Sequence, residues 1–336
     1  PILLNLVMIA SNVVAWALDT GNTATTGYIF AWGLFAAGVV QFALLTIACR
    51  RAAMPLLPRW PRMTPDVKRV IKLSIPGIVS GGVMQINLVV ATMIATTIDG
   101  AVAYLYYADR LYQLPLGVIG VAIGVVLLPD LSRKLRAGDE AGAINSQNRA
   151  LELSLLLTLP SAIALMAIPA PIIHTVFEHG AFTRADTIAV VPAVLVFASG
   201  LPAFALSKVF QPGFYAREDT STPMRFALIS VLVNVAASLI LSRWFGHVGI
   251  ALATSLAAWV NAGLLGFALS RKGLFLLDDR ARSRLPRILV SSLAMGGLLL
   301  AGAWLLRSNY TEQAGFIAAA WGLLLLVTGG ALSYFV

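Results

Sequence analysis

The run AVAYLYYADRLYQLPLGVIGVAIGVVLLP at residues 101–129 has the length of a membrane-spanning helix and a charged pair in its interior. A helix that crosses a bilayer needs about 20 mostly apolar residues. Asp109 and Arg110 lie about ten residues from the start of the run, roughly 15 Å along a helix and hence near the bilayer midplane. An arginine there costs at least about 2.5 kcal/mol, so it is kept where it faces a bundle interior or a water-filled cavity. The run therefore predicts a transmembrane helix with one polar face.

The composition of the whole chain is that of a membrane protein. Of its 336 residues, 59% are hydrophobic and 12% are charged, whereas soluble domains carry about 25% charged residues. Low charge, glycine without a fixed period and the single cysteine, Cys49, exclude disordered, collagen-like and disulfide-scaffold classes. We therefore expect an all-α polytopic membrane protein. An apolar run is under way at Pro1 with no cleavable signal pattern before it, so we expect the chain to begin inside a longer protein.

Long apolar runs separated by charge, proline and glycine predict about ten transmembrane helices. A T-x-x-D sequence from Thr183 to Asp186 also predicts a capping box at the start of the sixth span. The predicted spans are residues 1–18, 25–48, 73–98, 101–128, 151–176, 187–211, 224–242, 248–270, 288–306 and 314–336.

The loops between these spans alternate in charge. The loops at 49–72, 129–150, 212–225 and 271–287 contain seven, four, two and six lysines and arginines, whereas the opposite loops contain three in total. Cytoplasmic loops carry an excess of such cations, so we expect these four loops and both chain ends in the cytoplasm. Cations beside spans set topology and contact anionic lipids, which accounts for the net charge of +9. Few aromatic residues interleave with them, and we do not expect nucleic-acid binding.

Four polar residues of the 101–129 run share one helix face, because Tyr106, Asp109, Arg110 and Gln113 follow the spacing i, i+3, i+4, i+7. The planar, permanently charged guanidinium of Arg110 suits a phosphate or a carboxylate. This favours a transporter of an anionic substrate. The alternative is an Asp–Arg pair that only holds two helices together. Neighbours in sequence point about 100° apart on a helix, so Asp109 could instead pair with another helix.

The remaining polar residues form no sequence pattern typical of a catalytic site. Gln85 and Asn87, in the third span, suit either interhelical hydrogen bonds or the lining of a cavity. The three histidines lie at span ends or in outer loops, and no HExxH, CxxC, GxSxG or P-loop pattern occurs. We therefore expect neither a catalytic site nor a cofactor.

Four segments carry a resemblance to a known family. They are PILLNLVMIASN at 1–12, YYADRLYQLPLGVIGVAIGVVLLPDLSRKL at 106–135, FEHGAFTRADT at 177–187 and FQPGFYAREDTSTPMRFALISVLVN at 210–234. In this order they resemble the MurJ/MviN family, the bacterial lipid II flippases of the MOP exporter superfamily. The resemblance spans nearly the whole chain, and it is the combination of segments that is specific.

The resemblance implies a fourteen-helix transporter with two six-helix lobes and two further C-terminal helices. The ten predicted spans would then be helices five to fourteen. Residues 1–72 would hold the last two helices of the N-lobe and a basic cytoplasmic linker, and residues 73–270 the C-lobe. Residues 271–336 would hold a cytoplasmic loop and two helices that form a groove for a lipid tail.

The resemblance also implies a substrate and a site. The substrate would be lipid II, the undecaprenyl-diphosphate-linked peptidoglycan precursor, moved across the bacterial inner membrane from the cytoplasmic to the periplasmic leaflet for cell wall synthesis. Arg110 matches the family arginine that lines the central cavity, and Asp109 matches the aspartate before it. Gln113 lies where some members have glutamate, so only a hydrogen-bonding role carries over. With Tyr106 these residues form the expected substrate-binding site.

A metal site is not expected. Some members bind sodium at positions that match Ala91, Asn234 and Ser238, but alanine stands at 91 where an aspartate is expected. We expect the membrane potential to be the energy source instead. Two alternatives stay open: another MOP-type exporter, for drugs or a different polyprenyl-linked glycan, and a non-transporting scaffold for cell-wall synthesis.

Overall fold

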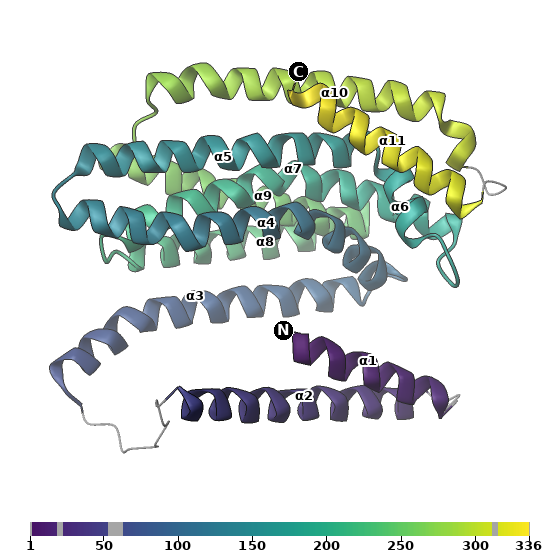
Figure 1. Cartoon of the computed structure of the whole chain (residues 1–336), viewed down its shortest axis with the longest axis horizontal. Coiled ribbons are helices and arrows are strands. Elements are labelled where there is room, and N and C mark those ends of the chain that lie inside the picture. The colour runs from purple at the N-terminus through teal and green to yellow at the C-terminus, as the bar shows by residue number, and fades with distance from the viewer. Residues whose placement is uncertain (1, 19–22, 53–62, 311–314, 336) are drawn as a thin grey trace. The chain divides into compact units, whose positions relative to one another are not determined.

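The computed structural model describes residues 2–18, 23–52, 63–310 and 315–335, and within these ranges the chain forms helices and no strand (Figure 1). The all-α prediction is therefore confirmed. The helices are α1 (Ile2–Ala17), α2 (Thr23–Arg51), α3 (Pro65–Ala95), α4 (Ala101–Arg136), α5 (Glu140–Ala167), α6 (Pro169–Phe177), α7 (Arg184–Tyr215), α8 (Ser221–Phe245), α9 (His247–Arg271), α10 (Asp279–Leu305), the 3₁₀ turn η1 (Arg307–Tyr310) and α11 (Phe316–Phe335).

Helices occur at the places of all ten predicted spans, although the fifth span is divided between α5 and α6. Within the described residues, seven helices are long and apolar enough to cross a membrane, namely α2, α5, α7, α8, α9, α10 and α11, and α1 is a shorter apolar helix. The number of helices that cross the membrane stays a prediction.

The chain divides into two compact units, Pro1–Val67 and Lys68–Val336. In the first unit α1 packs against α2. A Cβ atom at Gly33 would lie 2.1 Å from the side-chain oxygen of Ser11, so glycine is what lets the two helices approach this closely. The division into lobes at residue 72 and the groove in residues 271–336 stay predictions.

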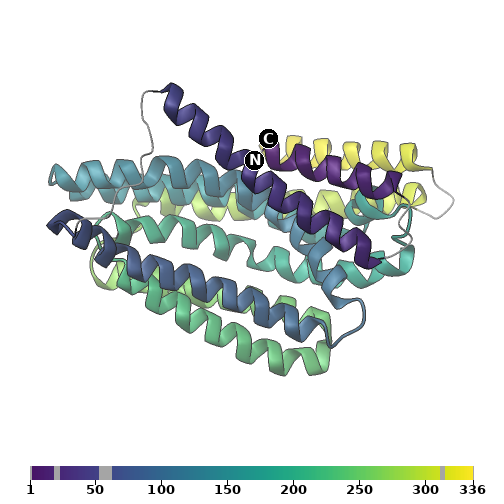
Figure 2. The same cartoon turned by 90° about the horizontal axis from the view of Figure 1, so that it is seen from below.

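The second unit is built around α7, which packs against α4, α5 and α9. Figure 2 shows the long helices of this unit running side by side. Val190, Val194 and Leu201 of α7 are fully buried. More of α7 is buried than of its neighbours, and a helix that is apolar on all sides belongs in a protein core or in lipid. α7 therefore forms the centre against which the other helices are held.

Several helices extend well beyond the predicted spans at the basic end of the unit. α4 ends at Arg136 and is 36 residues long, about 54 Å, whereas the hydrocarbon core is about 30 Å thick. α5 begins at Glu140 rather than 151, and α10 at Asp279 rather than 288. Hydropathy locates only the part of a helix that lies in lipid, and charged residues continue a helix in water because their helix propensity is high. Much of what was predicted as loop is therefore helix.

The predicted fifth span, 151–176, is wrong as a single helix. The helix is interrupted at Ile168, so that α5 ends at Ala167 and α6 begins at Pro169. Proline lacks the amide hydrogen that a continuing helix needs and is favoured at a helix start. Ile168 is an apolar, buried residue, so no polar residue in the sequence marks the interruption of the helix.

The predicted capping box is confirmed: the Thr183 amide donates a hydrogen bond of 2.7 Å to the Asp186 carboxylate.

Ion pairs tie the basic loops to one another at one end of the second unit. Arg217, after α7, pairs with Glu140 at the start of α5 at 2.6 Å. Lys272, after α9, pairs with Asp219, before α8, at 3.1 Å. The three basic loops of this unit thus lie at the same end, as the predicted alternation requires.

Candidate functional site

The four residues predicted to share a face of α4 do so. An Nη2 hydrogen of Arg110 is donated to the hydroxyl oxygen of Tyr106 over 2.8 Å, and the guanidinium carbon lies 4.6 Å from the centre of the Tyr106 ring. Both contacts follow from the i, i+4 spacing, which places side chains one turn apart on the same face. The hydroxyl and the ring are both neutral, so they orient the guanidinium without cancelling its charge.

The second pair on this face is Asp109 and Gln113. The side-chain amide of Gln113 donates to the Asp109 carboxylate, and the hydroxyl of Tyr112 also donates to it. Within the described part of the chain, Asp109 and Arg110 thus find their hydrogen-bond partners on α4 itself. No interhelical pairing is seen there that would make the charges a link between helices, which leaves the polar face available to a ligand.

The opposite face of α4 is packed against the core. Ala108 and Leu111 are buried, and the ring of Tyr112 stacks on Phe197 and Phe204 of α7 with centroid distances of 5.1 and 5.6 Å. Tyr106, in contrast, is 54% exposed. Arg110 and Gln113 are exposed as well. α4 therefore presents its polar face outward from the core against which its other face packs.

A second polar cluster joins α3 to α8. The amide of Asn234 donates to the side-chain oxygen of Asn87 over 2.9 Å, and the hydroxyl of Ser238 donates to the side-chain oxygen of Asn234 over 3.3 Å. Of the two readings open for Asn87, the interhelical hydrogen bond is the one observed. Gln85 is exposed and takes no part in this cluster.

The cluster contains two of the three positions considered for sodium. Ala91, the third, packs with apolar neighbours of α3, α4 and α9. The oxygens at this point come from amides and a hydroxyl, with no carboxylate in the cluster. Among the described residues no group of three or more histidine, cysteine, aspartate or glutamate side chains is placed to hold a metal ion.

Two of the histidines make structural contacts at the end opposite the basic loops. His174 lies 3.0 Å from the carboxylate of Glu178, and His247 contacts the carbonyl oxygen of Ala189 at 2.8 Å. Burial raises the pKa of Glu178, but hydrogen bonds from Thr187 and His174 outweigh it, so the pKa lies below its ordinary value. These groups fasten the turn between α6 and α7.

One cluster escaped the sequence reasoning. Glu152, on α5, is nearly buried and lies within 3.6 Å of three arginines of α5 and α10. These arginines were predicted to lie in loops, because the spans predicted from hydropathy start later than the helices α5 and α10 do. The signal was nonetheless present: Arg280, Arg284 and Arg287 follow the spacing i, i+4, i+7 of one helix face.

A model of the family "Lipid II flippase MurJ" matches residues 1–321. A probable lipid II flippase MurJ of Rhizobium tropici is 46% identical over 301 residues, which is 89% of this chain and 56% of that protein. The corresponding protein of Rhizobium meliloti strain 1021 is 44% identical over 341 aligned positions, and the alignment covers 98% of this chain and 63% of that protein.

Solved structures agree in fold. A lipid II flippase MurJ in an inward closed conformation matches with a TM-score of 0.74 at 24% identity, over 99% of this chain and 64% of that one. An outward-facing multidrug transporter of the MATE family, within the MOP superfamily, matches with a TM-score of 0.56 at 17% identity over 79% of this chain. At these identities the likeness shows a shared fold.

The chain thus spans 56–63% of the length of these two relatives. Its match to the family model covers nearly all of its own length, and the helical fold agrees. The chain belongs to the lipid II flippase MurJ family.

Proposed function

We propose that this protein moves lipid II from the cytoplasmic to the periplasmic leaflet of the bacterial inner membrane, for cell wall synthesis, and that it is a transporter rather than an enzyme. Its membership of the MurJ family supports the substrate. The observation that carries the proposal is the exposed guanidinium of Arg110 on a helix whose other face is packed in an apolar core. Lipid II has a diphosphate, and the donor fork of arginine matches its oxygens.

Each residue of the polar face has a distinct task in this proposal. Arg110 donates one hydrogen bond to the hydroxyl of Tyr106, and its other N–H groups are available for the diphosphate. Tyr106 is a positioning residue that fixes the direction of the guanidinium. Gln113 and Tyr112 occupy oxygens of Asp109, which keeps that carboxylate hydrogen-bonded instead of turned toward the anion.

Transport would proceed by alternating access. The headgroup enters from the cytoplasm, Arg110 binds the diphosphate, and a change between inward- and outward-open states exposes it on the other side. The tail stays in lipid along α10 and α11, whose outward faces are apolar. The basic loops and both chain ends lie in the cytoplasm under the positive-inside rule.

The energy source is the membrane potential rather than sodium. The cluster of Asn87, Asn234 and Ser238 offers neutral oxygens only, and Ala91 supplies no ligand. The opposing reading would need a hard anionic ligand at this point, which these side chains do not provide.

A complementation experiment tests the function. The full-length gene is expressed in a bacterium depleted of its own lipid II flippase, as wild type, Arg110→Ala and Lys208→Ala at matched membrane levels. Lys208 is the matched control because it is another exposed cation within a predicted span, on α7. We expect cells that express wild type or Lys208→Ala to grow, and cells that express Arg110→Ala to lyse.

Each other outcome has a definite meaning. Rescue by Arg110→Ala would make Arg110 a structural residue or the protein a scaffold. Failure of the wild type would contradict the substrate and favour another MOP-type exporter.

A further inference from the structure

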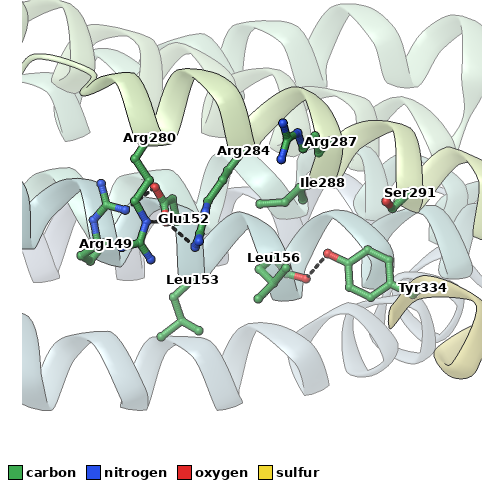
Figure 3. Close-up of a pocket in the computed structure, with 10 residues that line it drawn as sticks. All are labelled: Arg149, Glu152, Leu153, Leu156, Arg280, Arg284, Arg287, Ile288, Ser291 and Tyr334. Atoms are coloured by element: carbon green, nitrogen blue, oxygen red, sulfur yellow. Dashed lines mark hydrogen bonds and ion pairs between the residues drawn. The ribbon is translucent and has the colours of Figure 1, made fainter. Parts of the chain in front are cut away.

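A pocket of about 510 Å³ lies between α5, α10 and α11, far from the polar face of α4 in sequence and on other helices (Figure 3). Small-molecule sites typically measure about 300–1,000 Å³. Figure 3 shows arginines from two helices gathered around Glu152 at one end, and Leu156, Ile288 and Tyr334 toward the other. The pocket is lined by Arg149, Glu152, Leu153, Leu156, Arg280, Arg284, Arg287, Ile288, Ser291 and Tyr334.

The charged end of the pocket is partly neutralised by one central carboxylate. Glu152 lies 2.6 Å from Arg149, 3.5 Å from Arg280 and 3.6 Å from Arg284. Arg149 also pairs with Asp278, the cap of α10. Four arginines therefore face two carboxylates, and the pocket retains an excess of positive charge.

Two of the arginines have donors to spare. Within the described residues Arg287 makes no hydrogen bond or ion pair, although its side chain lines the pocket. The Nε atom of Arg149 is buried and has no hydrogen-bond partner. A buried donor left unsatisfied is costly, and an anionic oxygen is the partner that a guanidinium prefers.

The other end of the pocket is apolar and closed by an aromatic residue. Leu156 of α5 and Ile288 of α10 line this end, and the hydroxyl of Tyr334 donates to the carbonyl oxygen of Leu156 over 2.9 Å. Leu153 of α5 also borders the pocket. Leu153 is 47% exposed. Tyrosine is enriched at the membrane interface because its side chain has an apolar ring and a polar hydroxyl.

The pocket crosses the predicted edge of the membrane. Arg280, Arg284 and Arg287 belong to the segment 271–287, predicted as cytoplasmic, while Ile288 opens the predicted ninth span. A lipid has its phosphate at this depth and its acyl chains directly below it. The order of charged and apolar residues along the pocket is thus the order of the parts of a lipid.

We propose that this pocket binds the phosphodiester headgroup of an anionic membrane lipid at the cytoplasmic surface, with the acyl chain along Leu153, Leu156 and Ile288. The occupant is a lipid of the surrounding bilayer, and the site is separate from the proposed substrate site on α4. An anionic lipid is favoured over a zwitterionic one because the site has net positive charge. A lipid is favoured over a free phosphate because most of the pocket wall is apolar.

Native mass spectrometry of the purified full chain tests the site, with phosphatidylglycerol as the probe and phosphatidylcholine of the same acyl chains as the zwitterionic comparison. The variant is Arg287→Gln, which removes a pocket charge that holds no ion pair. Its matched control is Arg282→Gln, on the same helix but outside the pocket, with the same loss of charge. Loss of one charged contact corresponds to roughly a tenfold change in binding.

We expect Arg287→Gln to weaken the first phosphatidylglycerol bound by about tenfold, Arg282→Gln to leave it unchanged, and phosphatidylcholine to bind more weakly to wild type. Equal effects of the two variants, or none, would overturn the site. Equal binding of the two lipids would overturn the preference for anionic headgroups. Displacement of phosphatidylglycerol by inorganic phosphate at comparable concentrations would show a free-anion site and overturn the lipid as occupant.

Discussion

α4 and α10 both carry arginine at helical spacing, but they hold it in opposite ways. On α4, Arg110 is oriented by the neutral hydroxyl and ring of Tyr106. On α10, Arg280 and Arg284 are drawn toward the nearly buried carboxylate of Glu152. The guanidinium of Arg110 donates to a neutral hydroxyl, and the adjacent Asp109 carboxylate, which attracts it electrostatically, is itself hydrogen-bonded by Gln113 and Tyr112, so Arg110 keeps donors for a ligand. Arginines around a carboxylate give up part of their charge to fasten two helices together.

This difference separates function from stability. Changes on the polar face of α4 should affect transport with little effect on unfolding. Changes at Glu152 should do the reverse, because this residue joins α5 to α10.

The largest effect on stability is expected for Glu152→Gln. The substitution leaves three arginines without their shared counter-charge, and loss of a partner for buried or half-buried charged groups costs about 2 kcal/mol. The arginines are 28–55% exposed, so solvent screens part of the repulsion. Thermal unfolding in detergent measures the effect, with Arg110→Ala as the comparison.

We expect Arg110→Ala to change the free energy of unfolding by no more than about 0.5 kcal/mol, as for other exposed positions. If Arg110→Ala destabilised the protein as much as Glu152→Gln, the polar face of α4 would be structural and the contrast would fail.

A smaller effect, on lipid II binding, is expected for Tyr106→Phe. The ring and its contact with the guanidinium remain, but the hydroxyl that accepts from Arg110 is lost, which corresponds to about 1 kcal/mol or roughly fivefold in lipid II affinity. Binding of lipid II to the purified protein measures it. Tyr107→Phe, on the neighbouring face, is the control and should change nothing. No change with Tyr106→Phe would mean that the hydroxyl does not position Arg110.

The smallest effect concerns pH at the start of α10. A backbone hydrogen bond from Ala281, together with the ion pair to Arg149, holds the pKa of Asp278 below its ordinary value. A depressed carboxyl pKa stabilises the fold above the unfolded value, about 3.9, and this contribution is lost as the pH falls through the folded value.

The unfolding temperature of wild type should therefore fall more steeply below pH 4 than that of Asp278→Asn. At neutral pH the free energies of unfolding of the two proteins should differ by less than about 1 kcal/mol, because asparagine also caps helices well. Parallel pH profiles of the two proteins would remove Asp278 from the account.

Much of the fold followed from the sequence, since long apolar runs and alternating loop charge report directly on the membrane. The helix ends did not follow, because residues 140–150 and 279–287 are polar and helical at once. The break at Ile168 was also hidden, because an apolar residue before proline resembles a continuing span. A single sequence does not show which helices pack against each other, so the hydrogen bond from Asn234 to Asn87 could not be predicted.

The site shows the same division. The spacing of Tyr106, Asp109, Arg110 and Gln113 predicted their shared face, because neighbours on one helix are fixed by its period. The assignment of these residues to substrate binding stays a prediction. The arginine pocket was missed because its two halves, on α5 and α10, are about 130 residues apart in the chain.

Direct binding of lipid II to the purified full-length protein tests the central claim, that Arg110 holds the diphosphate through its donor fork. The series is wild type, Arg110→Lys, Arg110→Ala and Lys208→Ala. Two charged hydrogen bonds correspond to about 3 kcal/mol, so Arg110→Ala should bind more than about a hundredfold more weakly. Arg110→Lys should fall between the two because it keeps charge without the fork, and Lys208→Ala should match wild type. Undiminished binding by Arg110→Ala would contradict the account.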